Sequence, residues 1–334
     1  MLKVAIIGAG TMGKVHTDCY KSIMNIEVAA VCDIQEEKAK ALADIHDAKA
    51  YVDFDAMLQK EMIDVVDICL PTYLHKEFAL KSIGRNKHVF CEKPIALNIE
   101  DAKEMIEEAK TKNVKFSVGH VVRFFPAYSN AVQTVKSGRI GTPKLIRTTR
   151  TGAYPSWNWQ NWYSNYSLSG GPLLDLVIHD FDWIRYNFGD VERVYAKSLT
   201  GRNLKQLDHC LVTLRLKNGA IAHVEGSWAY PPGSIFGTTF EIIGTKGQIE
   251  SDSRASTPIK KHIKRDNSVD IILESPVFSS EEPYTAELQE FIDSIIENKE
   301  PEVSGEDAIK AIEISIAAIE SAKTGEVVIL GGGR

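Results

Sequence analysis

The first 120 residues alternate between short apolar runs and longer amphipathic stretches. Five runs are apolar almost throughout instead of at every second position: KVAIIG, EVAAVCD, VVDICLP, KHVFCE and KFSVGH. Uninterrupted runs of this kind are typical of strands that are buried on both faces of a parallel sheet. Helices are expected between them, over 35–45, 74–83 and 99–112. The alternation predicts a doubly wound α/β domain with a parallel sheet.

The pattern changes after the KFSVGH run. A short helix is expected over 127–136 and a strand near 144–150, followed by the aromatic loop YPSWNWQNWYSNY and a helix that begins at SGGP. From 191 to 274 short strands follow one another with turn signals at KNG and GTKG, which predicts an antiparallel sheet. Two helices, over about 284–298 and 306–323, and the strand EVVIL come last.

These patterns predict two domains, which is also what 334 residues suggest at roughly 150 residues per domain. The α/β domain covers residues 1–121. The rest, 122–334, is expected to form an α+β domain with a large, mostly antiparallel open sheet.

Charge and composition exclude several classes of protein. With 39 Lys and Arg against 45 Asp and Glu, the formal charge is −6, and no Lys/Arg stripe is present that would neutralise a nucleic-acid backbone. No apolar run approaches the roughly 20 residues that span a bilayer, and the N-terminal apolar stretch is too short for a signal peptide. Five scattered cysteines without a CxxC motif indicate reduced thiols and no zinc site. We expect a cytoplasmic protein with no nucleic-acid partner, no membrane partner and no metal.

Three glycines follow the first predicted strand directly. Gly8, Gly10 and Gly13 form the pattern G-x-G-x-x-G between KVAII and a helix expected over 11–24. In a Rossmann unit the first glycine permits a tight turn, the second lets the backbone approach a pyrophosphate, and the third lets the helix pack closely. The phosphates would lie at the N-terminus of the helix. Because a strand and a helix flank the motif, residues 1–121 are predicted to form a Rossmann domain that binds NAD(P).

Asp33 ends the second predicted strand, 20 residues after Gly13. A carboxylate there can accept hydrogen bonds from the hydroxyls of the adenine ribose, whereas a 2′-phosphate would meet a negative charge with no basic residue before Lys38. This favours NAD over NADP. Asp33 could instead cap the helix expected from about Gln35, and both roles can hold together.

Two further segments end predicted strands at the carboxyl edge of the sheet, where doubly wound sheets bind ligands. In CLPTYLH, His75 is either a cofactor contact or a solvated residue of the next helix. In CEKP, the proline after Lys93 holds that lysine extended. Its ammonium group is then expected to point over the crevice where nicotinamide and substrate meet, although most lysines are surface charges.

The helix that begins at SGGP carries an acid and a base. Asp175 and His179 are four residues apart and so are expected on one helix face. A histidine beside a carboxylate can take the proton of a hydroxyl group whose carbon loses a hydride. The same spacing is also common in solvated helix pairs.

Together these segments resemble the Gfo/Idh/MocA family of oxidoreductases, which includes inositol dehydrogenases and glucose-fructose oxidoreductase. The resemblance runs through GAGTMGKVH, VCDIQEEKA, DVVDICLPTYLH, KHVFCEKPIAL, VGHVVRFFPAY and SGGPLLDLVIHD, and so covers nearly the whole chain. It implies that Lys93, Asp175 and His179 are catalytic. His179 would take the hydroxyl proton, Asp175 would orient it and bind substrate, and Lys93 would hydrogen-bond the reacting oxygen.

The resemblance also implies the ligands and the assembly. Substrates would be sugars, inositols or related cyclic polyols and their keto forms, and the open sheet of the second domain would join subunits into a homodimer or homotetramer. Arg123 matches a recurring arginine near cofactor and substrate, or else forms a salt bridge at a helix start. Tyr154 and Trp157 lie in the aromatic loop, which suits a sugar ring, although its tryptophans could be core or interface residues. His120 departs from the Phe or Tyr expected after VG.

The leading hypothesis is an NAD(H)-dependent oxidoreductase that transfers hydride between nicotinamide and a secondary hydroxyl or ketone. The alternatives are an NAD-dependent glycosidase that oxidises its sugar transiently, and a nucleotide-binding regulator without catalysis. The residues expected to bind the cofactor are Gly8, Gly10, Thr11, Met12, Gly13, Asp33, Ile34, Leu70, Pro71, Thr72, His75, Glu92, Lys93 and Arg123. Those expected to bind substrate are Lys93, Arg123, Tyr154, Trp157, Asp175 and His179.

Overall fold

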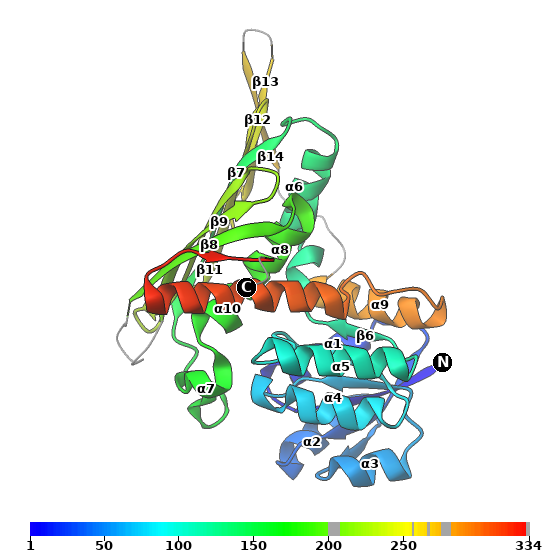
Figure 1. Cartoon of the computed structure of the whole chain (residues 1–334). Helices are drawn as coiled ribbons and strands as arrows, with labels where there is room; N and C mark the ends of the chain where they lie inside the picture. The colour runs from blue at the N-terminus through cyan, green and yellow to red at the C-terminus, as the bar shows by residue number, and fades with distance from the viewer. Residues whose placement is uncertain (200–207, 256, 266–267, 275–281, 332–334) are drawn as a thin grey trace. The chain divides into compact units, whose positions relative to one another are not determined.

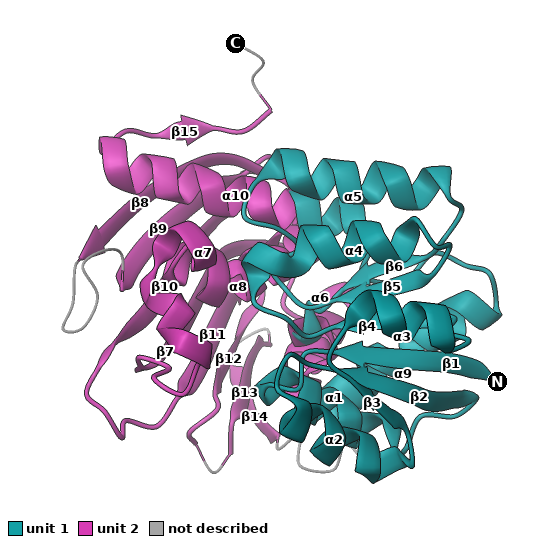
Figure 2. Ribbon diagram, turned by 90° about the horizontal axis from the view of Figure 1, so that it is seen from below, with its two compact units in different colours: residues 1–121, 281–309 teal, residues 122–280, 310–334 magenta. Residues whose placement is uncertain are grey.

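The computed structural model of the chain describes residues 1–199, 208–255, 257–265, 268–274 and 282–331. The chain folds into two compact units, coloured separately in Figure 2. Unit 1 holds residues 1–121 and 281–309, and unit 2 holds residues 122–280 and 310–334. Helix α9 (Pro283–Ile296) therefore lies in unit 1, whereas a single cut after residue 121 assigns it to the second domain.

Unit 1 is built on a six-stranded sheet in which every neighbouring pair is parallel (Figure 1). The strand order is β3-β2-β1-β4-β5-β6, which is the doubly wound Rossmann order, with the topological switch between β1 and β4. This confirms the fold predicted for the first part of the chain. The strands are β1 (Leu2–Ile7), β2 (Ile26–Cys32), β3 (Lys49–Tyr51), β4 (Val65–Ile68), β5 (His88–Cys91) and β6 (Phe116–Val118).

The helices of unit 1 follow the predicted segments with small shifts at their ends. They are α1 (Thr11–Tyr20), α2 (Glu36–Ala43), α3 (Phe54–Lys60), α4 (His75–Ile83), α5 (Ile99–Thr111) and α9. Helix α1 ends four residues before the expected boundary. Strand β3 and helix α3 were not predicted. Side-chain caps start three of these helices: Asp53 accepts a hydrogen bond from Ala56 N, Asn98 accepts one from Asp101 N, and Glu282 accepts one from Thr285 N.

The core of unit 1 explains why α9 belongs to it. The central strands β1 and β4 are buried on both faces, as uninterrupted apolar runs require. Leu288, Phe291 and Ile292 of α9 join the same hydrophobic cluster as Val4, and the ring centroids of Phe90 and Phe291 are 5.6 Å apart. This packing joins segments about two hundred residues apart in the sequence, so a local pattern does not indicate it.

Unit 2 contains a nine-stranded sheet in the order β14-β13-β12-β11-β7-β10-β9-β8-β15. Strands β7 and β10 are parallel and the other neighbours are antiparallel, so the predicted mostly antiparallel sheet is confirmed. The strands are β7 (Pro143–Ala153), β8 (Val191–Leu199), β9 (His209–Leu216), β10 (Ile221–Tyr230), β11 (Gly237–Gly244), β12 (Gly247–Asp252), β13 (Ile259–Lys264), β14 (Val269–Glu274) and β15 (Val328–Ile329).

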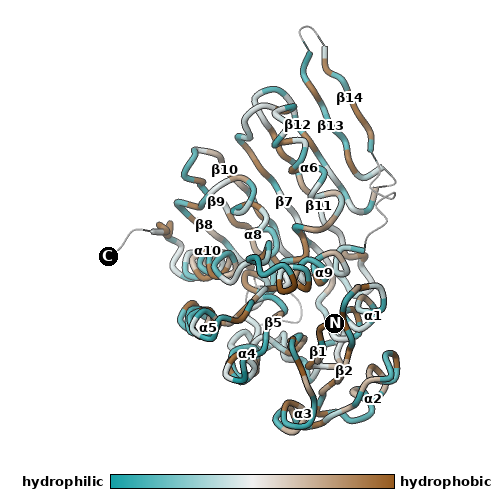
Figure 3. Tube along the Cα trace, turned by 90° about the vertical axis from the view of Figure 1, so that its right-hand side faces the viewer, coloured by the Kyte–Doolittle hydropathy of each residue, from teal (hydrophilic) through white to brown (hydrophobic). Residues whose placement is uncertain are grey.

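One face of this sheet is covered by helices. Buried residues of α6 (Pro126–Lys136), α8 (Ile178–Phe188) and α10 (Gly305–Thr324) share a hydrophobic cluster with the inward residues of the strands. The alternate positions on the other face are more exposed, among them Leu211, Ile221 and Ile271. Figure 3 shows both hydrophobic and hydrophilic positions along β13 and β14. Within the described residues, no helix is both long and apolar enough to cross a membrane.

The packing of α9 in unit 1 can be tested with two substitutions on that helix. Phe291 is fully buried, so Phe291→Ala should lower the free energy of unfolding by about 3–5 kcal/mol in chemical denaturation. Ile296 is 51% exposed on the same helix, and Ile296→Ala should cost less than about 1 kcal/mol. Equal, small effects of the two substitutions would contradict the placement of α9.

Candidate functional site

The glycine-rich turn joins β1 to α1 and leaves room for a ligand at one of its three glycines. Gly8 has φ +94°, and a Cβ there would lie 2.6 Å from Cys69 O. A Cβ at Gly13 would lie 1.9 Å from Gly8 O, so α1 packs directly on the turn. A Cβ at Gly10, by contrast, would meet no protein atom within 4 Å. The first and third glycines thus serve packing, while the second faces open space where a pyrophosphate would approach.

The start of α1 is suited to an anion. Gly10 is its N-cap residue and supplies no side chain to the first backbone N–H groups, and the first turn contains no acidic residue. Such N–H groups and the positive end of the helix dipole favour a phosphate. Thr11, Met12 and Gly13 form this first turn, with Thr11 exposed and Met12 half-buried. The residues present therefore fit the pyrophosphate of a dinucleotide.

Asp33 lies just after β2, and its side chain bonds to the backbone of the glycine-rich turn. Its Oδ2 accepts a hydrogen bond from Ala9 N at 2.7 Å, and its Oδ1 accepts one from Gln35 N at 2.8 Å. The N-cap of α2 is Gln35, so Asp33 orders the segment before that helix without being its cap residue. Each carboxylate oxygen has a further lone pair that can accept a ribose hydroxyl. The neighbouring Ile34 is largely exposed, as an adenine-facing side chain would be.

His75 joins two loops at the carboxyl edge of the sheet. Its ring nitrogens lie 2.8 Å from the carbonyl oxygens of Leu70 and Pro94. The ring is fully buried, so His75 is not a solvated helix residue. His75 holds these two loops together, and a contact between His75 and a cofactor stays a prediction. Beside it, Thr72 is buried, and Leu70 and Pro71 are half-buried.

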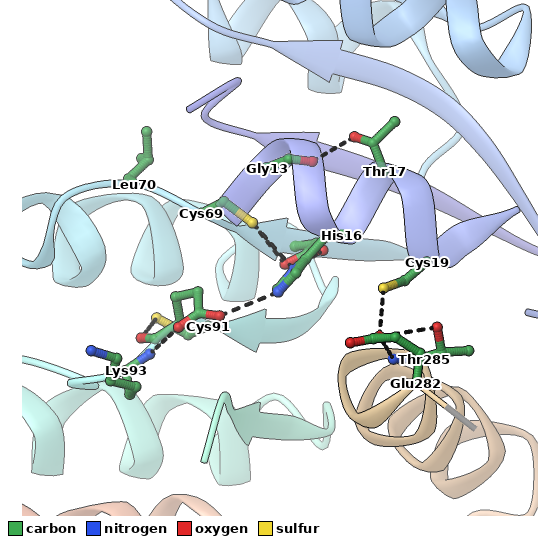
Figure 4. A network of polar contacts seen from close by, with 12 residues as sticks. Gly13, His16, Thr17, Cys19, Cys69, Leu70, Cys91, Lys93, Glu282 and Thr285 are labelled. Atoms are coloured by element: carbon green, nitrogen blue, oxygen red, sulfur yellow. Dashed lines mark hydrogen bonds and ion pairs between the residues drawn. The ribbon is translucent and has the colours of Figure 1, made fainter. Parts of the chain in front are cut away.

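A buried network that we did not predict lies between α1, β4 and β5 (Figure 4). His16 Nδ1 is 2.9 Å from Asp67 Oδ2, and His16 Nε2 is 3.2 Å from Glu92 Oε1. Cys69 Sγ lies 3.2 Å from His16 Nδ1. His16 and Asp67 are fully buried and Glu92 nearly so. One sequence signal pointed to such a network: Asp67 is a charged residue inside an apolar strand, and a buried charge needs a partner.

The charges in this network stabilise one another. Burial alone would lower the pKa of His16, but the charge and hydrogen bond of Asp67, together with Cys69, raise that pKa well above its ordinary value. Burial alone would raise the pKa of Glu92, but His16 and the Lys93 backbone lower it. The two neighbouring carboxylates therefore favour the protonated form of His16. Burial also raises the pKa of the Cys69 thiol, which stays protonated.

Lys93 follows β5 at the same edge of the sheet. Its backbone N–H donates to Glu92 Oε2 at 3.0 Å, and the Lys93–Pro94 peptide bond is cis. The side chain of Lys93 is half-buried. Lys93, Asp33 and the glycine-rich turn therefore all lie at the carboxyl ends of the strands of unit 1, where the topological switch point places a ligand.

In unit 2, Asp175 and His179 do not share one continuous α-helix. Asp175 lies in a π-helical turn (Pro172–Leu176), and α8 begins only at Ile178 after Val177 leaves the helical region with ψ 0°. The prediction of one helix that begins at SGGP and carries both residues is therefore wrong. The sheet brings the turn close, since a Cβ at Gly226 of β10 would lie 2.3 Å from Val177 Cγ1. A π turn is frequent at functional sites. Asp175 is buried and His179 half-buried.

Two buried ion pairs hold α8. The guanidinium of Arg123 donates to both carboxylate oxygens of Asp182, from Nε at 2.8 Å, and its central carbon lies 3.6 Å from the centroid of the Tyr186 ring. Arg150 Nε donates to Asp180 Oδ2 at 2.9 Å. In the structure, Arg123 thus makes the salt bridge that the sequence offered as one alternative. A direct contact between Arg123 and a cofactor or substrate stays a prediction.

The aromatic loop before the π turn forms a cluster around Tyr163. The Tyr163 ring is stacked on Trp162 with centroids 4.2 Å apart, and Trp228 of β10 lies 5.4 Å from it. The ring centroids of Tyr154 and Trp228 are 6.1 Å apart, and the Tyr154 hydroxyl donates to Asn161 Oδ1. Trp157 is 66% exposed. Part of the loop is therefore core, and Trp157 lies at its surface, where contact with a ligand stays a prediction.

Comparison with known proteins decides the family. A family model described as "Oxidoreductase family, NAD-binding Rossmann fold", of the Gfo/Idh/MocA group, matches residues 2–120. Its companion, "Oxidoreductase family, C-terminal alpha/beta domain", matches residues 132–330. This chain belongs to the Gfo/Idh/MocA family of oxidoreductases.

Individual relatives agree with this assignment over nearly their full length. The chain is 30% identical to myo-inositol 2-dehydrogenase of Thermotoga maritima, covering 96% of each protein. It is 30% identical to scyllo-inositol 2-dehydrogenase (NAD(+)) of Bacillus subtilis, covering 97% of this chain and 95% of that one. Its structure matches levoglucosan dehydrogenase in complex with NADH and L-sorbose with a TM-score of 0.89 at 25% identity, covering 99% of both chains. The predicted Gfo/Idh/MocA oxidoreductase is confirmed, and the glycosidase and regulator alternatives are not favoured.

The different roles of the glycines yield a prediction for Gly10. Gly10→Ala should leave the thermal midpoint of the free protein nearly unchanged, because its Cβ would meet no protein atom within 4 Å. The same Cβ would occupy the space of the pyrophosphate, so the dissociation constant for NADH, measured by fluorescence titration, should rise at least about tenfold. Gly13→Ala is the contrasting variant and should lose stability. Unchanged NADH affinity in Gly10→Ala would contradict the placement of the phosphates.

Proposed function

We propose that this chain is an NAD(H)-dependent dehydrogenase that oxidises a secondary hydroxyl group of an inositol, a sugar or a related cyclic polyol. The observation that carries the proposal is the open N-cap of α1 at Gly10, beside Asp33 and Lys93 on the same sheet edge. The names of the two inositol 2-dehydrogenases, each 30% identical over nearly the whole chain, support the substrate class.

The preference of the site for NAD over NADP rests on Asp33. Both of its oxygens already accept backbone hydrogen bonds, which keeps the carboxylate in place beside the glycine-rich turn. The 2′-phosphate of NADP would approach this fixed negative charge, whereas the 2′-hydroxyl of NAD can donate to it. The next basic residue, Lys38, comes five positions later on α2.

The chemical roles follow from the residue types. Bound NAD supplies the acceptor for a hydride from the carbinol carbon. His179 accepts the hydroxyl proton on a ring nitrogen, and Asp175 orients the imidazole and binds substrate. Lys93 donates a hydrogen bond to the reacting oxygen and stabilises negative charge there. Arg123 and Arg150 fix α8, which carries His179, through their buried carboxylate partners.

The exposed ring of Trp157 and the hydroxyl of Tyr154 are the proposed sugar contacts. An aromatic face packs against the C–H groups of a sugar ring, and the amides of the same loop can bond its hydroxyls. Tyr154 is already fixed by Asn161 and Trp228, so it is ordered before a ligand arrives.

The proposed function is tested by NADH formation on a panel of inositols, sugars and polyols. We expect NAD-dependent turnover of at least one cyclic polyol, with little turnover when NADP replaces NAD. Lys93→Ala should bind NADH normally and lower kcat about 100-fold or more, because it removes a donor to the reacting oxygen. The exposed Lys103 of α5 provides the control, and Lys103→Ala should keep full turnover. Full turnover in Lys93→Ala, or no NADH formation with any member of the panel, would contradict the assignment.

We further propose that the uncovered face of the nine-stranded sheet joins two or more copies of this chain. Exposed aliphatic side chains lie on it near both ends: Leu211 and Ile221 on β9 and β10, and Val269, Ile271 and Leu273 on β14. A face with this much exposed aliphatic surface is typical of an interface.

The five cysteines are free and buried, which supports the expected cytoplasmic location.

The assembly is tested by light scattering on the purified protein. The chain has a mass of 37.1 kDa, so we expect a mass two or four times that value. Replacing Ile271 and Leu273 by Asp should reduce the mass without unfolding the protein, because both side chains are exposed. A wild-type protein with the mass of one chain would contradict the proposed interface.

A further inference from the structure

The side chain of Glu92 connects the buried His16 to the backbone of Lys93. Its Oε1 lies 3.2 Å from His16 Nε2, while its Oε2 accepts the Lys93 N–H at 3.0 Å. Gly119 also lies next to the Glu92 carboxylate, since a Cβ at Gly119 would lie only 3.2 Å from the carboxyl atoms. The carboxylate is therefore fixed by α1, by the loop after β6 and by its own following residue.

Each ring nitrogen of His16 faces a carboxylate, and this requires a particular proton arrangement. With a proton on both nitrogens, His16 donates a hydrogen bond to Asp67 and forms an ion pair with Glu92, and one positive charge offsets two buried negative ones. Phe90 and Tyr284 pack against the ring, with centroids 5.6 and 6.3 Å away. His16, Asp67 and Cys69 also offer atoms close enough to share a metal ion, but the bond from His16 Nδ1 to Asp67 already accounts for their arrangement.

The residue after Lys93 is held as well. Pro94 O lies 2.8 Å from His75 Nδ1, and His75 is fully buried. The main chain of Lys93 is thus tied on its N-terminal side through Glu92 to His16, and on its C-terminal side to His75. A rotation of this backbone would break a buried hydrogen bond, which is costly.

We infer that Glu92, held in place by His16, is a positioning residue that fixes the Lys93 backbone so that the lysine side chain reaches the reacting oxygen. This rests on the proposed function, in which Lys93 contacts that oxygen. Glu92 itself would touch neither substrate nor the reacting atoms. A displacement of about 1 Å at a reacting group can cost about 100-fold in rate, so a backbone anchor of this kind matters for turnover.

The inference is tested by a matched pair of substitutions on opposite sides of His16. Glu92→Gln and Asp67→Asn each remove one negative charge next to the same imidazole without changing size. The amide in Glu92→Gln has one oxygen where the carboxylate uses two, so it cannot face both His16 and Lys93 N, whereas Asp67→Asn keeps an oxygen for His16 Nδ1 and gives up only the longer contact from Cys69 Sγ at 3.5 Å. Glu92→Asp is a second variant, which keeps the negative charge but has a side chain too short to reach both partners. It still tests the inference if the Glu92→Gln protein does not fold.

We expect both Glu92 variants to lower kcat at least about tenfold with the NADH dissociation constant nearly unchanged, against a loss below about threefold in Asp67→Asn. Turnover is measured on the best polyol of the panel. If Glu92 acts through Lys93, then Glu92→Gln should cause almost no further loss of turnover in a Lys93→Met background. Losses that multiply in the double variant would mean that Glu92 affects turnover independently of Lys93. Either that result or equal losses in Glu92→Gln and Asp67→Asn would overturn the positioning role of Glu92.

The failure of this inference differs from the failure of the proposed function. A slow Lys93→Met protein together with a Glu92→Gln protein of normal turnover overturns the positioning role and leaves the role of Lys93 intact. Wild-type turnover in Lys93→Met overturns the role of Lys93, and with it the role of Glu92.

Discussion

Unit 1 depends on the buried His16 and the two carboxylates that face its ring nitrogens. His16 lies one turn after the glycine-rich loop and pairs with Asp67 in β4 and with Glu92 just after β5, so it joins three segments that are distant in sequence. A buried charge that loses its partner is strongly destabilising, and this fixes α1 relative to the two strands. The N-terminal end of α1 and the Lys93 segment therefore keep a constant spacing at the edge of one sheet. Hydride transfer requires such a spacing, because the nicotinamide and the reacting oxygen must be held together.

In unit 2, buried ion pairs likewise fix one helix, α8. Arg123 and Arg150 come from separate segments and pair with Asp182 and Asp180, which are buried on that helix. The residue after the π turn, Val177, packs closely on β10 because Gly226 has no side chain there. Together these contacts fix Asp175 and His179 on a rigid support, which the roles proposed for these two residues require.

The parts of the fold that depend on local pattern could be predicted. The uninterrupted runs of β1, β4 and β5, the glycine spacing and Asp33 each carry their signal within a few residues. Strand β3 was missed because three residues show no periodicity, and the place of α9 in unit 1 was not indicated because its packing with Phe90 spans about two hundred residues. The partners of His16 lie 51 and 76 positions away, so the network was missed although Asp67 in an apolar strand indicated it. The interrupted helix at Val177 depends on a tertiary contact with Gly226 that spacing does not reveal.

Direct transfer of hydride between the substrate carbon and the cofactor is the central claim about this protein. The measurement that tests it most directly uses a polyol substrate deuterated at the oxidised carbon, with mass spectrometry of the NADH that forms. We expect the deuterium to be retained in the reduced nicotinamide, in stoichiometric amount with the ketone produced. Reduced cofactor without deuterium, or substrate conversion with no net reduction of NAD, would contradict the proposed reaction.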